Sequence, residues 1–590
     1  MSLDGNLAHR GIALVKAWLH DPPSKALGIQ GHEARTRRLL ELVVGPDEAL
    51  RAVEMTKDDD VFAAITERLP MPTAGASGER AVKPADGIVF VHPLSGTHRP
   101  LEIGQLHPEI EEAIVSDIVA KAGDSAWVRF LALWRCLPDR LAARHPDWAL
   151  VPADTRQPDH TIFHHLDMAA AFETAGPGAP LLSFSIGPVQ SFIAAARTLR
   201  DLWSGSLLLS KLTFAAMRPV LTAVGPQAFV YPSPRRIPDV DVWLREQGVP
   251  EVLVRKPDLG SLLLPAIPNR FLAIVPAGSA TELAEKCETA VRQAWLQIAS
   301  DVRNRLHDRL GAFDSWDARW SEQIKTFWEI RTSLLPRKKL DDELRSDLLG
   351  GLPEKADQVR RLAEAIPENH RYSFEQKHAG RWAADVALSA RIAEAAREVA
   401  HFRSDPAEGE VPPKCTLFGE LEQVGPPGLD ASRRFWELAR EKLVIDGLRL
   451  RDGERLSAVG LIRRFWPAAA LGKLLNEKVW SEDTRIADTA TVAARIWLRE
   501  AGIDPTEWRD WNGTWVFDDA PQDEDEAKCP AELRAKLSAA RRSLGKAPPR
   551  YFAVLHMDGD HLGWWLRGEL APTIAEALHP KTREYFESLG

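Results

Sequence analysis

Residues 181–206 read LLSFSIGPVQSFIAAARTLRDLWSGS. The short, mostly apolar run 181–186 ends at Gly187-Pro188, a dipeptide that marks a turn, so we expect a strand there. Apolar side chains then recur at helical spacing from about Val189 to Met217. The stretch therefore predicts a strand, a tight turn and a long helix in direct succession.

The segments that follow extend this pattern. Short runs bounded by prolines predict strands at 228–231 and 270–275, and periodic apolar positions predict a helix over 280–310. Strand, helix, strand, strand, helix is the order of a ferredoxin-like domain. With further helices expected from Trp316 to about Arg403, this domain covers 180–403.

The rest of the chain is expected to form other units, because 590 residues are too many for one core. Residues 1–172 are predicted to be mostly helical. An acidic, proline-bearing linker opens a small irregular unit over 404–470, and a helical region follows over 471–547. A β-rich run at 551–557 begins a last unit over 548–590. The predicted fold class is therefore α+β, with several domains.

The composition is that of a soluble globular protein, with 45% hydrophobic and 27% charged residues. The formal net charge of −9 argues against a basic coat protein, so any nucleic acid would be held by a local patch or by partner subunits. No signal-peptide core and no apolar run of about 18 residues is present, which predicts no membrane span. The four cysteines form no C-x-x-C pair, which fits a cytoplasmic protein without a disulfide framework.

The dipeptide His20-Asp21 is a candidate metal-binding and catalytic site. It follows an apolar helical stretch and precedes two prolines. An imidazole nitrogen and a carboxylate oxygen can bind one divalent metal, whose bound water becomes a nucleophile for phosphodiester hydrolysis. His32, on a following segment, could add a ligand. The alternative is a helix-end histidine followed by a capping aspartate.

Two groups of carboxylates are further candidate metal ligands. Asp60 lies seven residues before Glu67, which would place both on one helix face, and the alternative is a solvated acidic turn. Asp558 and Asp560 flank Gly559 after the β-rich run, where a strand end could present both to Mg²⁺. An Asp-Gly turn is the alternative there.

Two other motifs carry weaker signals. The junction at 187–193 could hold a phosphate at a helix N-terminus, but no Gly-Lys-Ser/Thr follows, and a tight turn explains it as well. Cys415 resembles half a zinc knuckle in which Phe418 stands at the second cysteine position. One thiolate cannot hold a tetrahedral zinc, so we expect no zinc there.

Five segments together resemble the large, cyclase-like subunit of type III CRISPR effector complexes, in the Cmr (III-B) branch. The most specific is GPVQSFIAAARTLRDLWSGS at 187–206. The others, in order, are LHDPPSKAL at 19–27, PADTRQPDH at 152–160, IPNRF at 267–271 and MDGDHLG at 557–563. The resemblance covers nearly the whole chain.

The resemblance implies an N-terminal HD nuclease domain, two palm-like domains separated by a zinc-binding and helical region, and a C-terminal helical domain. Such subunits assemble with CRISPR RNA and other Cmr subunits, and pairing with target RNA switches on cleavage of single-stranded DNA. Many also make cyclic oligoadenylates from ATP. The implied ligands are a divalent metal (Mg²⁺, Mn²⁺ or a transition metal) and ATP.

The family's functional positions map onto this chain directly. His20 and Asp21 match the HD dipeptide, and Asp558 matches a metal-binding aspartate of the second palm. The candidate metal ligands are thus His20, Asp21, His32, Asp60, Asp558 and Asp560. The candidate nucleotide-contacting residues, in the junction that faces a nucleotide in the family, are Gly187, Pro188, Gln190, Ser191, Gly205 and Ser206.

Three departures from the family pattern bear on activity. The GGDD motif that supplies the other palm carboxylates is absent from this sequence, so we expect an incomplete cyclase in a truncated or split chain whose second palm only begins. Phe418 and Ser457 occupy cysteine positions of the zinc knuckle. His164-His165 stands where an Asp-His pair is common, and Glu67 stands where aspartate is frequent, although glutamate can also ligate.

The leading hypothesis is an antiviral effector subunit with an HD nuclease and an incomplete cyclase. A first alternative is a catalytically inactive scaffold of the same complex, which the degraded knuckle and the missing motif favour. A second is a stand-alone HD phosphohydrolase acting on small nucleotides. It would explain 1–172 but would leave the 187–206 segment without a purpose.

Overall fold

The computed structural model describes most of the chain. The described residues are 3–28, 31–48, 63, 66–67, 82–176, 178–311, 314–336, 381–398, 412–479, 487–508, 511–517, 528–555, 559–561, 564–565 and 570–587. None of the helices in these ranges is both long enough and apolar enough to span a bilayer.

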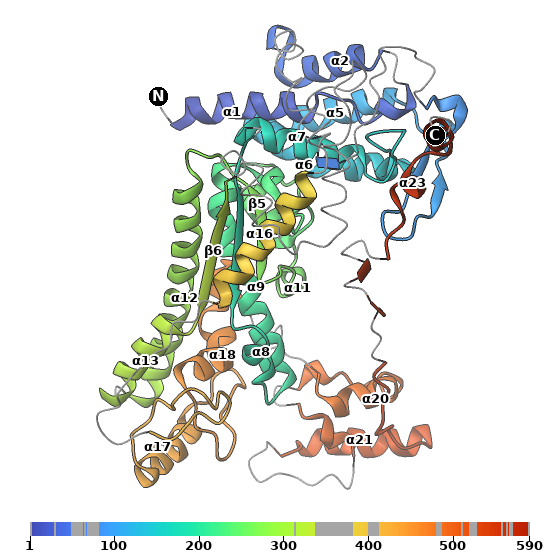
Figure 1. Ribbon diagram of the computed structural model, residues 1–590. Coiled ribbons are helices and arrows are strands. Elements are labelled where there is room, and N and C mark those ends of the chain that lie inside the picture. Colours follow the sequence, from blue (N-terminus) through green and yellow to red (C-terminus); the bar gives the residue numbers. More distant parts are fainter. Residues whose placement is uncertain are drawn as a thin grey trace.

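The first lobe is helical, as the sequence predicts (Figure 1). Its main helices are α1 (Leu3–Trp18), α2 (His32–Val44), α5 (Glu109–Ala122), α6 (Ala126–Ala142) and α7 (Ile162–Ala175). A short antiparallel hairpin of β1 (Val89–Val91) and β2 (His98–Pro100) interrupts them. The apolar face of α1 packs against α6 and α7, and Trp18 at its end is fully buried.

A four-stranded antiparallel sheet forms the centre of the molecule. Its strands are β3 (Leu181–Gly187), β4 (Phe229–Tyr231), β5 (Arg270–Ile274) and β6 (Glu329–Leu335), in the order β4-β5-β3-β6. With α9 (Leu199–Ala223) after β3 and α12 (Ala280–Leu310) after β5, this is the β-α-β-β-α-β arrangement of ferredoxin-like folds. The predicted strands at 181–186, 228–231 and 270–275 are confirmed.

The two faces of this sheet are covered by different helices. The long helices α9 and α12 pack against each other and contact the sheet strands. Helix α16 (Arg381–Glu398) packs on β3 and β6, and a buried hydrogen bond of 2.7 Å joins Ser183 Oγ to Ser389 Oγ (Figure 1).

Two predictions for this region are wrong. Helix was expected from Trp316 onward, but after α13 (Asp314–Thr326) the chain forms β6, because its alternating Ile330, Thr332 and Leu334 pair with β3 along that strand's whole length. The single helix expected from Val189 is two, α8 (Gln190–Ala194) and α9. Thr198 separates them because its hydroxyl accepts the Asp201 N–H and so caps α9.

The unit over 412–479 packs onto the sheet domain. It contains α17 (Leu429–Lys442), α18 (Ala458–Ala469) and α19 (Leu471–Leu475), and α18 contacts α9, α12 and α13. Helices α20 (Thr489–Glu500) and α21 (Ala531–Leu544) surround a separate small core that includes Trp497 and Leu533.

The prediction of a strand at 551–557 is wrong for the residues that the structure describes, and 556–557 lie outside them. Tyr551, Val554 and Leu555 are 78–90% exposed, and no described strand pairs with this segment. An apolar run with unpaired backbone groups is not a stable strand. The chain then returns to the helical lobe as α23 (Ile574–Ala577) and α24 (Pro580–Glu587) (Figure 1).

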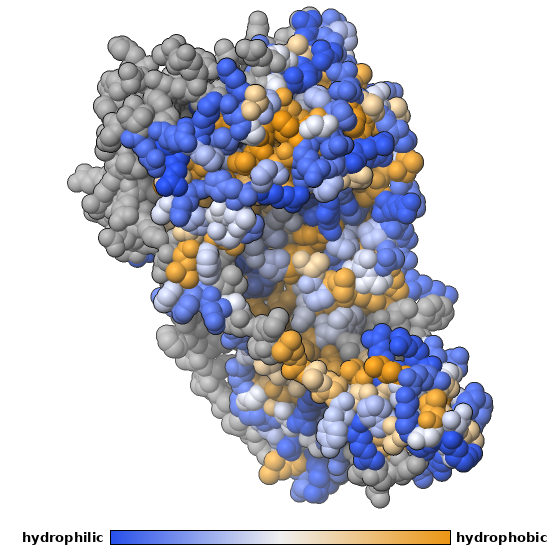
Figure 2. Space-filling model, turned by 90° about the vertical axis from the view of Figure 1, so that its right-hand side faces the viewer, coloured by the Kyte–Doolittle hydropathy of each residue, from blue (hydrophilic) through white to orange (hydrophobic). Residues whose placement is uncertain are grey.

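The surface is uneven in polarity. Figure 2 shows one face, on which hydrophilic surface predominates at the top and apolar atoms gather around a hollow midway down. The most exposed large apolar side chains on the described part of the molecule include Tyr551, Leu555 and Val554, all from the unpaired run. Exposed apolar surface of this kind commonly marks a place where other molecules bind.

A buried ion network joins α18 to α9. Arg464 Nε lies 2.7 Å from Asp201 Oδ1, and Arg464 Nη1 lies 3.1 Å from Glu454 Oε2. All three side chains are at most 4% exposed. Two carboxylates around one guanidinium tolerate burial only while the cation is present.

We expect Arg464→Leu to lower the free energy of unfolding by about 3–5 kcal/mol, because it leaves two carboxylates buried without their cation. Urea unfolding followed by tryptophan fluorescence measures the loss. The matched control is Arg440→Leu, which removes an exposed pair to Asp452 at 2.6 Å and should cost less than about 1 kcal/mol. Equal losses in the two variants would contradict this account.

Candidate metal centre

His20 lies just beyond the end of α1, and its ring is fixed by the helix end. The Nδ1–H group donates a hydrogen bond of 2.7 Å to the carbonyl oxygen of Ala17. The carbonyl oxygen of His20 accepts from the Thr36 hydroxyl of α2 at 3.0 Å. With Nδ1 used as a donor, Nε2 of the neutral ring carries the lone pair.

His165, on α7, also has its ring held by a hydrogen bond from Nδ1. This helix begins where Thr161 caps it, because the Thr161 hydroxyl accepts the His164 N–H. His165 Nδ1–H donates to Glu67 Oε2 at 2.8 Å, so its Nε2 also carries the lone pair. Nε2 of His165 lies 3.1 Å from Nε2 of His20. Two acceptor nitrogens this close are favourable only with a shared proton or a metal cation at that point.

Asp21 completes a group of three metal-ligating side chains. Its Oδ2 atom lies 3.5 Å from His20 Nε2 and 3.7 Å from His165 Nε2. The three ligand atoms lie within 4.8 Å of one another, and no other such group occurs among the described residues. The Lys25 ammonium also contacts Asp21. Two imidazole nitrogens and one carboxylate oxygen, all at most 7% exposed, form a donor set that suits Mn²⁺ and later transition metals.

Glu67 is the outer partner of this centre. Its side chain is 1% exposed. Burial by itself would raise the pKa of the Glu67 carboxyl, but the charge and hydrogen bond of His165, with His160 and His164 nearby, bring the pKa below its usual value. A carboxylate on the far nitrogen of a metal-ligating histidine fixes the ring and increases its basicity. Glu67 Oε1 has no hydrogen-bond partner among the described residues.

His160 and His32 lie at the edge of the centre. His160 Nε2 is 3.7 Å from Glu67 Oε2, and its Nδ1–H donates to Asp159 Oδ1 at 2.8 Å. His32 Nε2 is 3.8 Å from Asp21 Oδ1, and the His32 side chain is 27% exposed. His32 therefore lies where a substrate in solvent could reach it.

The other candidate metal ligands are Asp60, Asp558 and Asp560. Asp60 and Asp558 lie outside the described residues. Asp560 lies in an exposed turn and is not part of the metal-ligating group. Of the candidate metal ligands that the structure describes, His20 and Asp21 lie together, with His32 beside them.

The candidate nucleotide-contacting residues divide into two sets. Gly187 ends β3 and Pro188 follows it, both half-buried, and Gln190 and Ser191 are exposed at the start of α8. Gly205 is instead a packing residue, because a side chain there would begin 3.0 Å from Arg463 Nε. Ser206 donates to the Leu202 carbonyl oxygen within α9.

Two residues of the centre, His165 and His160, were not among the ligands proposed from sequence, and Glu67 was considered as a ligand beside Asp60 rather than as the partner of a histidine. His165 could have been found, because it is a histidine on a helix whose other inward residues, such as Leu166 and Ala169, are apolar. The sequence did not give the roles that Glu67 and His160 have in this centre, because those roles depend on contacts between segments about 100 residues apart.

The comparisons with known proteins agree with this fold. Residues 181–300 match the family model for the N-terminal part of the CRISPR-associated protein Cmr2. The chain is 24% identical to the Cmr subunit Cmr2 of Pyrococcus furiosus over 97% of its own length and 71% of that protein's. A segment covering 14% of the chain is 37% identical to 9% of the Cmr2 subunit of Saccharolobus solfataricus.

A solved structure shows the same fold. The chain is similar to one from the type III-B Cmr-beta complex in its apo state, with a TM-score of 0.55 and 17% identity. That match covers 83% of this chain and 54% of the other, so this chain spans about half the length of its solved relative. The chain is therefore Cmr2-like over most of its length.

Glu111 of α5 lies buried close to the centre. The Ser24 hydroxyl donates to Glu111 Oε2 at 2.9 Å. Burial raises the pKa of Glu111 to about 8, against the lowering effects of Ser24 and Arg35. The folded protein therefore holds a proton on Glu111 that the unfolded chain releases above about pH 4.5.

We expect Glu111 to contribute a decrease in the free energy of unfolding as the pH rises between about 4.5 and 8, because this residue binds the extra proton in the folded state over that window. Glu111→Gln should remove this dependence, which amounts to at most about 1.4 kcal/mol per pH unit. Urea unfolding at several pH values measures it. Glu109→Gln, an exposed carboxylate on the same helix, should keep the wild-type slope. Identical slopes for Glu111→Gln and wild type would contradict the assignment.

Proposed function

We propose that this chain is a subunit of a type III-B CRISPR effector ribonucleoprotein in which the His20–Asp21–His165 centre hydrolyses single-stranded DNA. The observation that carries the proposal is the pair of imidazole rings whose Nδ1–H groups are both occupied and whose Nε2 atoms lie 3.1 Å apart beside Asp21. Other Cmr subunits, CRISPR RNA and target RNA are the partners proposed from the similarity to Cmr2.

Each residue of the metal centre has a separate role. A divalent metal, when bound, lowers the pKa of its water and so supplies a hydroxide nucleophile. His20 and His165 would hold the metal through Nε2, and Asp21 would hold it through a carboxylate oxygen. Glu67 keeps His165 in the tautomer that exposes the Nε2 lone pair.

Two residues near the metal centre have side chains suited to contact a DNA substrate. The Lys25 ammonium contacts Asp21 and offers a positive charge for a phosphodiester. His32, partly exposed beside Asp21, is placed to give a proton to the leaving oxygen or to take one from water. The same arrangement could act on a small nucleotide, but the match of 181–300 to Cmr2 favours the CRISPR subunit.

The sheet domain is proposed as a nucleotide-binding palm. Its strand-to-helix junction leaves Gln190 and Ser191 exposed at the start of α8, beside Gly187 and Pro188 at the end of β3. ATP is the proposed ligand of this edge. The sequence contains no GGDD motif, so no oligoadenylate synthesis is proposed for the residues present.

A catalytically inactive scaffold is the second candidate. It is favoured by the knuckle region, where Cys415 and Phe418 are both 3% exposed and form part of the apolar core. The nuclease and the scaffold share the fold and differ at the metal centre, so one experiment separates them.

We expect His165→Ala in the full chain to lower Mn²⁺ affinity at least about 100-fold and to abolish Mn²⁺-dependent cleavage of single-stranded DNA, because one of the two ring ligands is lost. Isothermal titration and gel assays measure these effects. His164→Ala is the matched control, because His164 is the exposed neighbour on the same helix and should leave affinity within about threefold of wild type.

The double variant His20→Ala plus Asp21→Ala should behave like His165→Ala in both assays. If wild type binds Mn²⁺ but cleaves no DNA in the assembled complex, the scaffold is the better description. If wild type and His165→Ala bind Mn²⁺ equally, the metal centre itself is wrong.

A further inference from the structure

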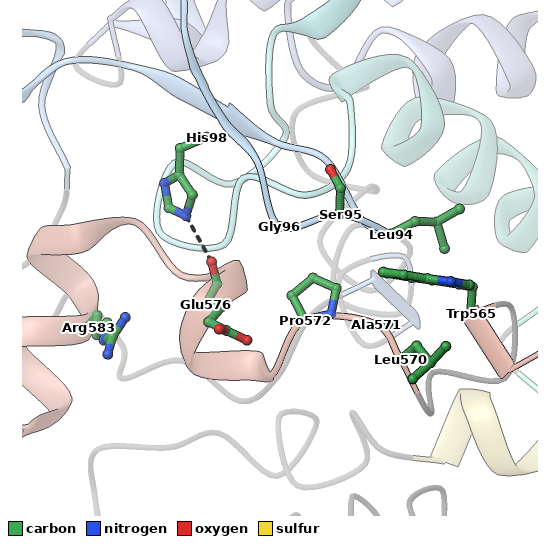
Figure 3. A pocket seen from close by; sticks show the side chains of 10 residues that line it. All are labelled: Leu94, Ser95, Gly96, His98, Trp565, Leu570, Ala571, Pro572, Glu576 and Arg583. Carbon is green, nitrogen blue, oxygen red and sulfur yellow. Dashed lines mark hydrogen bonds between the residues drawn. The ribbon is translucent and has the colours of Figure 1, made fainter. Parts of the chain in front are cut away.

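The segment 570–587, here called the docking segment, packs against the helical lobe although the two are more than 400 residues apart in sequence. Figure 3 shows Pro572 beside Gly96 in the turn of the β1–β2 hairpin, and His98 pointing at the main chain of Glu576. His98 Nε2–H donates to the Glu576 carbonyl oxygen at 2.9 Å. A cavity of about 330 Å³ remains between the hairpin and the docking segment.

His579 is the most engaged residue of this contact, and it is 5% exposed. Its backbone N–H donates to the Arg156 carbonyl oxygen at 2.9 Å. Its Nε2–H donates to the Gly87 carbonyl oxygen at 3.2 Å, and its Nδ1 accepts the Lys581 N–H at 3.2 Å. Both ring nitrogens of the neutral imidazole are thus hydrogen-bonded. Nε2 bonds to the helical lobe, and Nδ1 bonds to the first turn of α24.

An ion pair strengthens the same contact. Lys581 Nζ lies 2.6 Å from Asp86 Oδ1, next to Gly87. Leu578 and Thr582, on either side of His579, are 6% and 5% exposed. The docking segment is therefore attached by side-chain burial, by an ion pair and by main-chain hydrogen bonds.

Arg156 belongs to the loop 152–160, and this loop also carries His160. The loop is closed at its base, where the Ala153 N–H donates to the His160 carbonyl oxygen at 3.2 Å. It is also tied to the hairpin, because the Val91 N–H donates to the Pro158 carbonyl oxygen at 2.8 Å. Residues that hold the main chain at Arg156 therefore restrict where His160 can lie.

A continuous set of polar contacts leads from this loop to the metal centre. Within the loop, Gln157 donates to Asp159, which in turn accepts from His160 Nδ1. His160 Nε2 lies 3.7 Å from Glu67 Oε2, the atom that accepts from His165. Coupling between distant sites is carried by contiguous contacts of this kind.

We propose that His579 is a positioning residue for the metal centre: by holding loop 152–160, it keeps His160, Glu67 and His165 in the arrangement that binds metal. The inference rests on the proposed metal centre. The contact of His579 lies outside the metal centre, and only folding brings it near the centre.

The test compares metal affinity and amide exchange in the full chain. His579→Asn combined with Lys581→Ala keeps a side-chain acceptor at the start of α24 but removes the bond to Gly87 and the ion pair to Asp86. We expect Co²⁺ affinity, titrated through the visible absorption of the bound ion, to fall about fivefold or more. Amides of 152–160 should exchange faster than in wild type.

The matched control is Lys473→Ala. It removes an ion pair of the same length, 2.6 Å to Asp301, in a different part of the molecule. Its Co²⁺ affinity and its exchange at 152–160 should equal those of wild type.

The outcomes separate this inference from the proposed function. If the docking segment exchanges faster in the double variant while 152–160 and Co²⁺ affinity are unchanged, the positioning role is wrong. It is equally wrong if the docking segment exchanges as in wild type, because His579 and Lys581 then do not hold it. If wild type binds no Co²⁺, the proposed metal centre fails, and exchange at 152–160 alone decides whether the docking segment holds the loop.

Discussion

The arrangement of the sheet domain depends on two adjacent arginines of α18. Arg464 neutralises Asp201 and Glu454, while Arg463 donates to the carbonyl oxygens of Phe192, Ile193, Ala195 and Asp201. The carbonyls of Phe192, Ile193 and Ala195 lie at the end of α8, where helical hydrogen bonds run out, and that of Asp201 lies in the first turn of α9. Burial lowers the pKa of Arg463 to about 10, against the opposing effect of Asp201. The guanidinium groups thus join the 412–479 unit to the sheet domain and fix the break between α8 and α9.

This constraint explains part of the residue pattern in the 187–206 stretch without invoking a ligand. Gly205 gives Arg463 its space, and the Ser204 hydroxyl donates to the Arg463 carbonyl oxygen at 2.6 Å. Gln190 and Ser191 are exposed, so they do not have a packing role of this kind. The stretch therefore contains two kinds of residue, and only the exposed kind is available to a nucleotide.

The sequence predicted the elements that depend on a local pattern, but not those that depend on residues far apart in the chain. The strand at 181–186 and the helix at 280–310 follow from apolar periodicity and are confirmed. β6 was missed because its strand character comes from pairing with β3 rather than from its own composition. The run 551–555 has strand-like composition but no described strand partner, and its side chains are exposed. At the metal centre, the His20-Asp21 dipeptide was visible in sequence, whereas Glu67 and His160 are recruited from segments that only folding brings near.

Around Cys415 and Phe418, apolar packing links the 412–479 unit to the sheet domain. Cys415 Sγ accepts the Phe418 N–H at 3.3 Å, and the Phe418 ring packs against Phe192 and Phe327 with centroid distances of 6.0 and 5.9 Å. Ser457 caps α18 by accepting the Gly460 N–H, which places Arg463 one turn further on. The Phe418 ring thus touches α8 of the sheet domain through Phe192. The aromatic ring ties this unit to its neighbour, so the two units depend on each other for their apolar core.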